Sequence, residues 1–203
     1  MKINYDIKFC EQLKQIQGKK PKLLLHSCCG PCSSASLEKL EQFFDITIVF
    51  YNPNIYPKQE FDKRLFEQRK LLEKAFKNIS ILETEYNETE FLEKTKGLEN
   101  EKEGGARCGV CFALRLEKTA QLAKQNGFNY FGTTLTISPH KNEQIINLLG
   151  ENIAKKYGIN FLYSDLKKHD GYKRSIELSR IYDIYRQHYC GCRFSIQGDT
   201  VEL

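Results

Sequence analysis

The grouping of its cysteines constrains this chain more than any other sequence feature. Seven of the eight cysteines fall in three short motifs, and only Cys10 stands apart. Cysteines that merely fill a core are scattered singly along apolar faces. Thiols grouped far apart in the sequence are typical of an iron–sulfur cluster, a zinc site or a dithiol redox couple. The motifs are Ser27-Cys28-Cys29-Gly30-Pro31-Cys32, Arg107-Cys108-Gly109-Val110-Cys111 and Tyr189-Cys190-Gly191-Cys192-Arg193.

The length and composition predict a cytoplasmic protein with one real core. The chain has 203 residues, of which 40% are hydrophobic. Residues 1–20 are charged and lack the apolar run of a secretory signal. The longest aliphatic run, Leu23-Leu24-Leu25, is far too short to cross a membrane, so we expect no membrane association. Because stable disulfides are rare in the cytoplasm, the cysteine motifs are interpreted as metal-binding or redox-active.

Apolar runs rich in β-branched residues alternate along the chain with segments of helical periodicity. This alternation predicts an α/β fold, a three-layer Rossmann-like parallel sheet with helices on both faces. We expect a single domain over residues 1–203, with a core at about 21–165 and a helical, cysteine-containing C-terminal extension at about 166–203. The predicted strands are 22–26, 46–51, 79–82, 130–135 and 161–163, and the predicted helices are 33–44, 58–77, 108–125, 142–157 and 175–188.

The first two cysteine motifs both contain the Cys-x-x-Cys spacing. Cys29 and Cys32 lie between a predicted strand and a predicted helix, where the helix dipole favours thiolate, as in thioredoxin-type redox motifs. Cys108 and Cys111 open another predicted helix with the paired spacing of metal ligands. Two such pairs in one small chain favour a shared metal centre over two independent dithiols. The spacing leaves zinc and iron–sulfur both open.

The third motif has a single residue between its two thiols. A disulfide between Cys190 and Cys192 would close a small, strained ring, and strained disulfides are easily reduced. The neighbouring Arg193 would lower the pKa of a thiol beside it. These features favour a redox shuttle, with additional metal ligands as the alternative.

Charge is distributed unevenly in the second half of the chain. Residues 83–103 contain eight acidic side chains and three lysines, a net charge of −5. Residues 167–193 contain seven Lys or Arg and three acidic side chains, a net charge of +4, together with four tyrosines. Cations interleaved with aromatic rings suit a nucleic acid, although a solvated helix face with packed tyrosines fits the same pattern. Tyr172, Lys173 and Arg174 are the candidate nucleic-acid contacts.

Six separate motifs, in order from about residue 21 to 195, resemble those of the QueH family of epoxyqueuosine reductases. They are Leu24-Leu25-His26-Ser27-Cys28-Cys29-Gly30-Pro31-Cys32-Ser33, Tyr51-Asn52-Pro53-Asn54-Ile55, Arg107-Cys108-x-x-Cys111-Phe112, Thr133-Thr134-Leu135-Thr136-Ile137-Ser138, Gly171-Tyr172-Lys173-Arg174-Ser175 and Tyr189-Cys190-Gly191-Cys192. The resemblance implies a fold related to the adenine-nucleotide α-hydrolase (PP-loop) superfamily, with the cysteine turn in place of the phosphate loop.

The resemblance also implies a cofactor and a reaction. A [4Fe–4S] cluster would be held by Cys28, Cys29, Cys108 and Cys111, with Cys32 as a further candidate ligand and an additional iron nearby. Cys190 and Cys192 would be the redox-active pair. The reaction would be reductive removal of the epoxide oxygen of epoxyqueuosine at the wobble position of tRNA, the last step of queuosine biosynthesis. An unidentified low-potential electron donor is an implied partner.

Two other functions are compatible with parts of the sequence. An ATP-dependent tRNA-modifying enzyme of the PP-loop type with a cluster would need a Ser-Gly-Gly-x-Asp-Ser-like loop, but residues 28–33 stand in that place. A non-enzymatic zinc protein that binds RNA would need only the cysteines and the basic stretch. For a reductase, the candidate proton donors are His26, His140, Asp165 and His169, each of which is otherwise a structural polar residue.

Overall fold

A five-stranded parallel sheet forms the centre of the computed structural model, which describes residues 2–196. The strand order is β3-β2-β1-β4-β5, and every neighbouring pair is parallel. This arrangement confirms the predicted three-layer α/β class. The strands are β1 (Lys22–His26), β2 (Asp45–Phe50), β3 (Ser80–Glu83), β4 (Tyr130–Thr133) and β5 (Asn160–Phe161). Residues 197–203 of the expected C-terminal extension lie outside the described residues.

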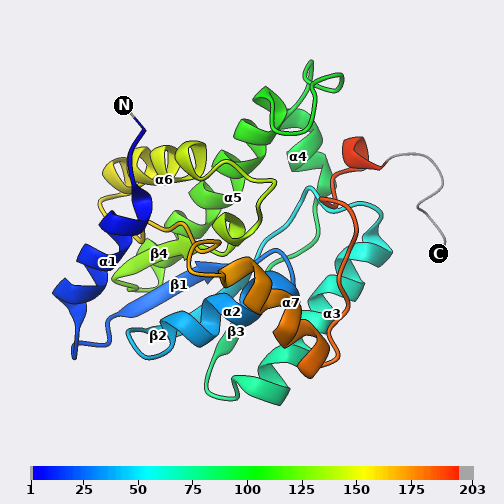
Figure 1. The fold of residues 1–203 in the computed structure, drawn as a ribbon. Coiled ribbons are helices and arrows are strands. Elements are labelled where there is room, and N and C mark those ends of the chain that lie inside the picture. Colours follow the sequence, from blue (N-terminus) through cyan, green and yellow to red (C-terminus); the bar gives the residue numbers. More distant parts are fainter. Residues whose placement is uncertain (1, 197–203) are drawn as a thin grey trace.

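Helices cover both faces of the sheet (Figure 1). In β1, Leu23 and Leu25 pack into an apolar cluster with α1, α2, α3 and α7, whereas Leu24 packs on the other side with α5 and α6. Successive side chains of a strand point to opposite faces, so a strand buried on both faces is apolar throughout. The helices are α1 (Tyr5–Ile16), α2 (Gly30–Leu40), α3 (Lys58–Ala75), α4 (Glu88–Lys94), α5 (Ala106–Gln125), α6 (Glu143–Tyr157) and α7 (Gly171–Ile181), with short 3₁₀ helices η1 (Leu135–Ile137) and η2 (Arg193–Ser195).

Two of these helices, α1 and α4, were not among the predicted elements. The Asn4 side chain caps α1 by accepting hydrogen bonds from two backbone N–H groups, and Phe9, Leu13 and Ile16 bury one face of the helix. Helix α4 lies within the acidic stretch and buries Phe91. Helix α4 has seven residues, four of them charged, whereas α1 has twelve residues and an apolar stripe interrupted by charged side chains.

Helix α7 was predicted at residues 175–188 but spans Gly171–Ile181. Beyond it, residues 182–192, here called the C-terminal segment, run along α3 and are not helical. Polar side chains of α3 bind this backbone instead: Lys74 donates to the Tyr182 carbonyl at 2.9 Å, and the Glu67 carboxylate accepts from the Tyr185 N–H at 3.0 Å. The helix ends early because tertiary hydrogen bonds replace those of further turns.

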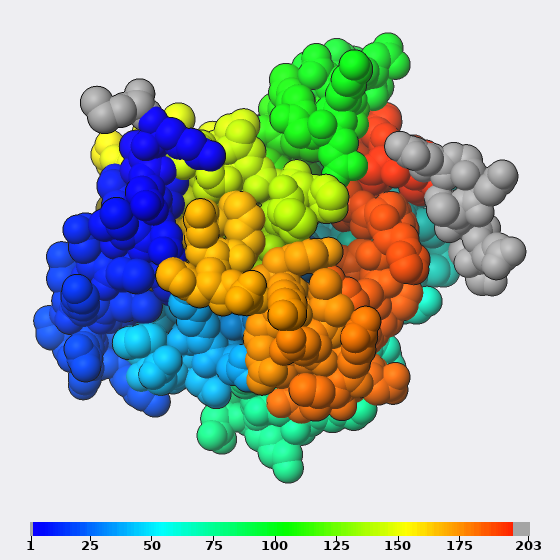
Figure 2. Space-filling model, viewed as in Figure 1, coloured from blue at the N-terminus to red at the C-terminus, as the bar shows by residue number. Residues whose placement is uncertain are grey.

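The strand order reverses between β1 and β4, and in such sheets ligands bind beyond the carboxyl ends of the strands at this point. The first cysteine motif follows β1, and η1 follows β4. Helix α7 packs against α2, and Figure 2 shows its orange residues directly beside the blue residues of α2. Among the described residues, no helix has the length and apolar character needed to span a bilayer.

Candidate active site and metal centre

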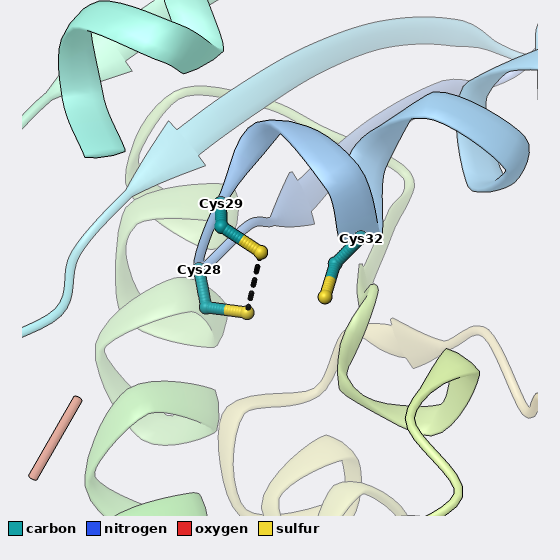
Figure 3. A group of neighbouring side chains, drawn as sticks. All are labelled: Cys28, Cys29 and Cys32. Atoms are coloured by element: carbon teal, nitrogen blue, oxygen red, sulfur yellow. Dashed lines mark hydrogen bonds between the residues drawn. The ribbon is translucent and has the colours of Figure 1, made fainter. Parts of the chain in front are cut away.

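Three cysteines meet in the turn between β1 and α2. The sulfurs of Cys28, Cys29 and Cys32 all lie within 4.8 Å of one another and point toward a common centre (Figure 3). The Cys28 and Cys29 sulfurs are 3.8 Å apart. Helix α2 begins at Gly30, three residues earlier than predicted, so Cys29 is its N-cap and Cys32 lies in its first turn. Three thiols this close can serve as ligands of a metal ion or of part of a cluster.

Contacts with α3 and with the C-terminal segment hold this turn in place. The hydroxyl groups of Ser27 and Ser33 both donate to the side-chain oxygen of Gln68 on α3, each at 2.7 Å. A side chain at Gly30 would place its Cβ 2.9 Å from Ile184 of the C-terminal segment and 3.1 Å from the Glu67 carbonyl oxygen. Glycine is therefore required here by the close approach of α2 to α3 and to the C-terminal segment.

The three thiols stabilise one negative charge on Cys28. Hydrogen bonds from Cys29 and Cys32 hold the pKa of Cys28 well below its usual range, against the effect of burial, and the cations Lys141 and Arg115 act in the same direction. The same hydrogen bond with Cys28, followed by burial, raises the pKa of Cys29 to about 12. The pKa of Cys32 is likewise raised by its bonds to Cys28 and Cys29. These pKa directions favour a thiolate at Cys28, the form of cysteine that binds metals.

A second group of cysteines lines a cavity of about 190 Å³ beside the group of Cys28, Cys29 and Cys32. Its walls include Cys108 and Cys111 from α5 and Cys190 and Cys192 from the C-terminal end. Phe91 of α4 packs against Cys111 and Cys192, so part of the acidic stretch helps to build this wall. Burial raises the pKa of Cys111 to about 12 and that of Cys192 to about 11.

Cationic side chains lie between the two cysteine groups. Arg115 is only 2% exposed and donates from Nε to the Cys111 carbonyl at 3.1 Å, while its buried Nη2 finds no hydrogen-bond partner within residues 2–196. Its charge acts on Cys28 and on Cys111, and Lys141 lines both cavities. A buried cation with a free donor is costly unless an anion neutralises it. The pair suits an anionic, thiolate-bound group.

A larger cavity of about 510 Å³ opens over the first cysteine turn. Cys28, Cys32 and Cys190 line it together with Tyr172, Arg186, Gln187, His188 and Tyr189. Arg186 is held by the Ser175 carbonyl and by the Ser179 hydroxyl, both at 3.2 Å, and lies 5.7 Å from the Tyr172 ring centre. A cavity of this size, with aromatic walls and a few polar groups, suits a ligand as large as a modified nucleoside.

Cys190 lines both cavities, whereas Cys192 lines only the smaller one. Gly191 between them has φ +104°, a backbone conformation available almost only to glycine. Its carbonyl accepts a 2.7 Å hydrogen bond from the Tyr56 N–H. The structure thus brings the third motif next to the first and the second.

The predicted nucleic-acid contacts lie in different surroundings. Tyr172 lines the larger cavity, and Lys173 beside it is exposed. Arg174 forms hydrogen-bonded ion pairs with Glu38 of α2 at 2.7 Å and with Glu177 at 3.2 Å. Much of the charge of Arg174 is therefore balanced within the protein.

Of the four candidate proton donors, only His140 lines the cavities. His26 is the last residue of β1 and is fully buried. Its Nε2 donates to the Tyr51 carbonyl at 3.1 Å, because a carbonyl can only accept, and its Nδ1 then accepts from the Thr133 hydroxyl at 3.0 Å. Burial, followed by the charge of Arg115, lowers the pKa of His26 to about 4, so this ring is neutral and structural.

The other two candidates also have structural partners. His169 is bonded to Asp6 of α1 at 2.8 Å, and Asp165 is paired with Lys167 at 2.5 Å. The first bond ties the segment before α7 to α1, the second lies within that segment, and neither involves the cysteines.

Sequence reasoning did not find the buried cations Arg64 and Arg115 or the partly buried Lys141. Arg115 follows Cys111 by four residues and Phe112 by three, so it shares their helix face, and a charge at such a position is a detectable signal. Arg64 likewise shares a face with Phe61 and Gln68. Lys141 lies in a loop and carried no such signal.

Comparison with known proteins places these features in one family. The family model described as "Epoxyqueuosine reductase QueH" matches residues 23–198. The epoxyqueuosine reductase QueH of Streptococcus pyogenes serotype M1 is 45% identical over 209 residues, covering all of this chain and 82% of the relative. The QueH of Staphylococcus epidermidis is 46% identical over 210 residues, covering all of this chain and 88% of the relative. That of Thermotoga maritima is 37% identical over 180 residues, covering 86% and 90%. The chain therefore belongs to the QueH family of epoxyqueuosine reductases.

Proposed function

We propose that this protein is an oxidoreductase that removes the epoxide oxygen of epoxyqueuosine in tRNA, giving queuosine. The observation that carries the proposal is the family match over residues 23–198, which contains all three cysteine motifs. The placement of these motifs at the switch point of the sheet supports it, because a reductase needs its electron-transferring groups beside the substrate cavity.

The cysteines fit an iron–sulfur cluster by their chemistry and by the charges around them. We propose Cys28, Cys29, Cys108 and Cys111 as the ligands of a [4Fe–4S] cluster, and Cys32 as an additional ligand or as part of a site for a second iron. Cys28 and Cys29 are buried in the turn after β1, and Cys108 and Cys111 line the adjacent cavity, outside the group of three close sulfurs. The free donor of Arg115 suits the negative charge of such a group. When bound, the cluster supplies electrons one at a time at low potential.

Reduction of an epoxide to an alkene and water consumes two electrons and two protons. Oxidation of the Cys190 and Cys192 thiols to a disulfide releases the same number of each, and a low-potential donor would then restore the dithiol. Cys190 lies at the junction of the two cavities, which supports this role. Of the four candidate proton donors, His140 is the one that lines both cavities, and it could hold a proton for the departing oxygen.

The larger cavity is the proposed place of the modified nucleoside. Enzymes that act on a base take it out of the stack and enclose it in a pocket, and aromatic side chains stack on the bases of single-stranded RNA loops. Tyr172 and Tyr189 supply such rings at this cavity. The exposed Lys173 beside Tyr172 would contact a phosphate.

An anaerobic assay tests the proposed function. Iron-loaded protein is incubated with epoxyqueuosine-containing tRNA and dithionite, and the digested nucleosides are analysed by mass spectrometry. We expect the nucleoside to lose one oxygen atom, and protein depleted of iron serves as the control. Unconverted epoxyqueuosine with fully iron-loaded protein would contradict the proposal. A colourless preparation that binds zinc and tRNA without turnover would support the non-enzymatic alternative, and conversion only with ATP would support the PP-loop alternative.

A further inference from the structure

We propose that Arg64 of α3 is a positioning residue, which fixes the Cys190-Gly191-Cys192 turn so that Cys190 and not Cys192 faces the substrate cavity. The inference rests on the proposed function only for the redox role of the two thiols. The arrangement of the turn itself is a property of the contacts described below.

The side chain of Arg64 binds backbone carbonyl groups at the start of the turn. The Arg64 side chain is 1% exposed, and its guanidinium donates to the Cys190 carbonyl at 3.1 Å and to the Tyr189 carbonyl at 3.4 Å. Its Nε donates to the Glu60 carboxylate at 2.6 Å, and its Cζ lies 5.3 Å from the Tyr189 ring centre. A planar guanidinium that is held at one edge and donates from the other fixes the orientation of what it binds.

Gly191 shows how closely the turn is fitted to Arg64. A Cβ atom at this position would lie 2.8 Å from Nη1 of Arg64 and 3.1 Å from its Cζ, and the φ of +104° would be strained for any other residue. On the opposite side, the Tyr56 N–H donates to the Gly191 carbonyl, and Ile55 forms an isolated β-bridge with Cys192. The turn is therefore held between α3 and the loop that follows β2.

This clamping makes the two thiols inequivalent. Cys190 is half-buried and lines both cavities, whereas Cys192 is 8% exposed and packs on Phe91 and Cys111. Rotation of the turn would exchange the environments of the two thiols or make them alike. Because Arg64 binds the carbonyl of Cys190 and that of the residue before it, Arg64 opposes such a rotation.

The rates at which the two thiols are alkylated report the position of the turn. Reduced, iron-loaded protein is treated anaerobically with iodoacetamide, and the modification of Cys190 and Cys192 is followed separately by peptide mass spectrometry. In the wild type we expect Cys190 to react faster. In Arg64→Gln the ratio of the two rates should fall severalfold, toward one, and Arg64→Lys should restore it in part, because a lysine can donate to one carbonyl at a time. Arg69→Gln, at an exposed arginine of the same helix, is the matched control and should leave the ratio unchanged.

Gly191→Ala provides a second variant, since Arg64→Gln leaves Glu60 buried without its cation and such a loss is strongly destabilising. The added methyl group should displace the guanidinium and lower the same ratio while leaving both members of the ion pair in place. General loosening of the fold would raise both rates, whereas displacement of the turn alone should lower the rate of Cys190 while it raises that of Cys192. An unchanged ratio in both Arg64→Gln and Gly191→Ala would overturn the inference. Absence of reductase activity in the wild type would overturn the proposed function and leave the ratio measurable.

Discussion

At the scale of single residues, the environment of each sulfur separates the cysteines into groups with different proposed roles. Cys28 and Cys29 are buried beside cations, Cys111 is buried beside Arg115, and Cys190 reaches the substrate cavity. The sequence was sufficient to group these cysteines, because their spacing is local. It was not sufficient to find Arg64, because the Cys190 carbonyl that Arg64 binds is 126 residues away and contact between them depends on the complete fold.

Serine substitutions should separate ligands from redox thiols. Replacing Cys28, Cys29, Cys108 or Cys111 by Ser should lower the iron content and the visible absorbance, because a hydroxyl is a poor substitute for a thiolate ligand. Cys190→Ser and Cys192→Ser should keep the iron and abolish turnover. Cys10→Ser, at an exposed position on α1, is the control and should change neither. Loss of iron from Cys190→Ser would instead identify Cys190 as a ligand.

At the scale of elements, the sheet was more predictable than the helix boundaries. The central strands β1 and β2 are apolar runs whose burial follows from the sequence itself, and all five strands lie where predicted within a few residues. The end of α7 could not be predicted in the same way. It depends on Lys74, Glu67 and Arg64, which bind the backbone of the C-terminal segment from another helix. Helix α1 did carry a signal, in Asn4 followed by an apolar stripe, that the charge of the surrounding residues obscured.

Two glycines beside cysteines have different surroundings, which predict opposite effects of substitution by alanine on the free energy of unfolding. Gly30→Ala should lower the free energy of unfolding by about 1–3 kcal/mol, because the new methyl group meets Ile184 and the Glu67 backbone. Gly109→Ala, in the first turn of α5, should raise it by about 0.5–1 kcal/mol, because no atom lies within 4 Å and alanine favours the helix. Anaerobic urea denaturation measures both values. Equal effects at the two positions would show that the close approach at Gly30 does not limit stability.

At the scale of the whole molecule, the basic charge of residues 167–193 is partly used inside the protein. Lys167 pairs with Glu143 and Asp165, Arg174 with Glu38 and Glu177, and Arg193 with Glu88 of the acidic stretch. The positive charge that this stretch can offer to an RNA is therefore smaller than its net charge. The exposed cations are Lys168, Lys173 and Arg180. Lys173 follows Tyr172 in the sequence, and Tyr172 lines the larger cavity.

Reversal of the charge at Lys173 tests whether this face binds tRNA. Lys173→Glu should weaken tRNA binding and reduce the slope of log K against log salt by about 0.7 for each phosphate that the variant no longer neutralises. Lys19→Glu makes the same charge change just before β1, at the opposite edge of the sheet, and should leave the slope nearly unchanged. Arg174→Gln should have a smaller effect than Lys173→Glu, because Glu38 and Glu177 already neutralise much of its charge. Fluorescence anisotropy at several salt concentrations measures all three. Equal slopes for Lys173→Glu and Lys19→Glu would place the tRNA on another face, since a variant that no longer neutralises a phosphate at Lys173 must release fewer counterions on binding.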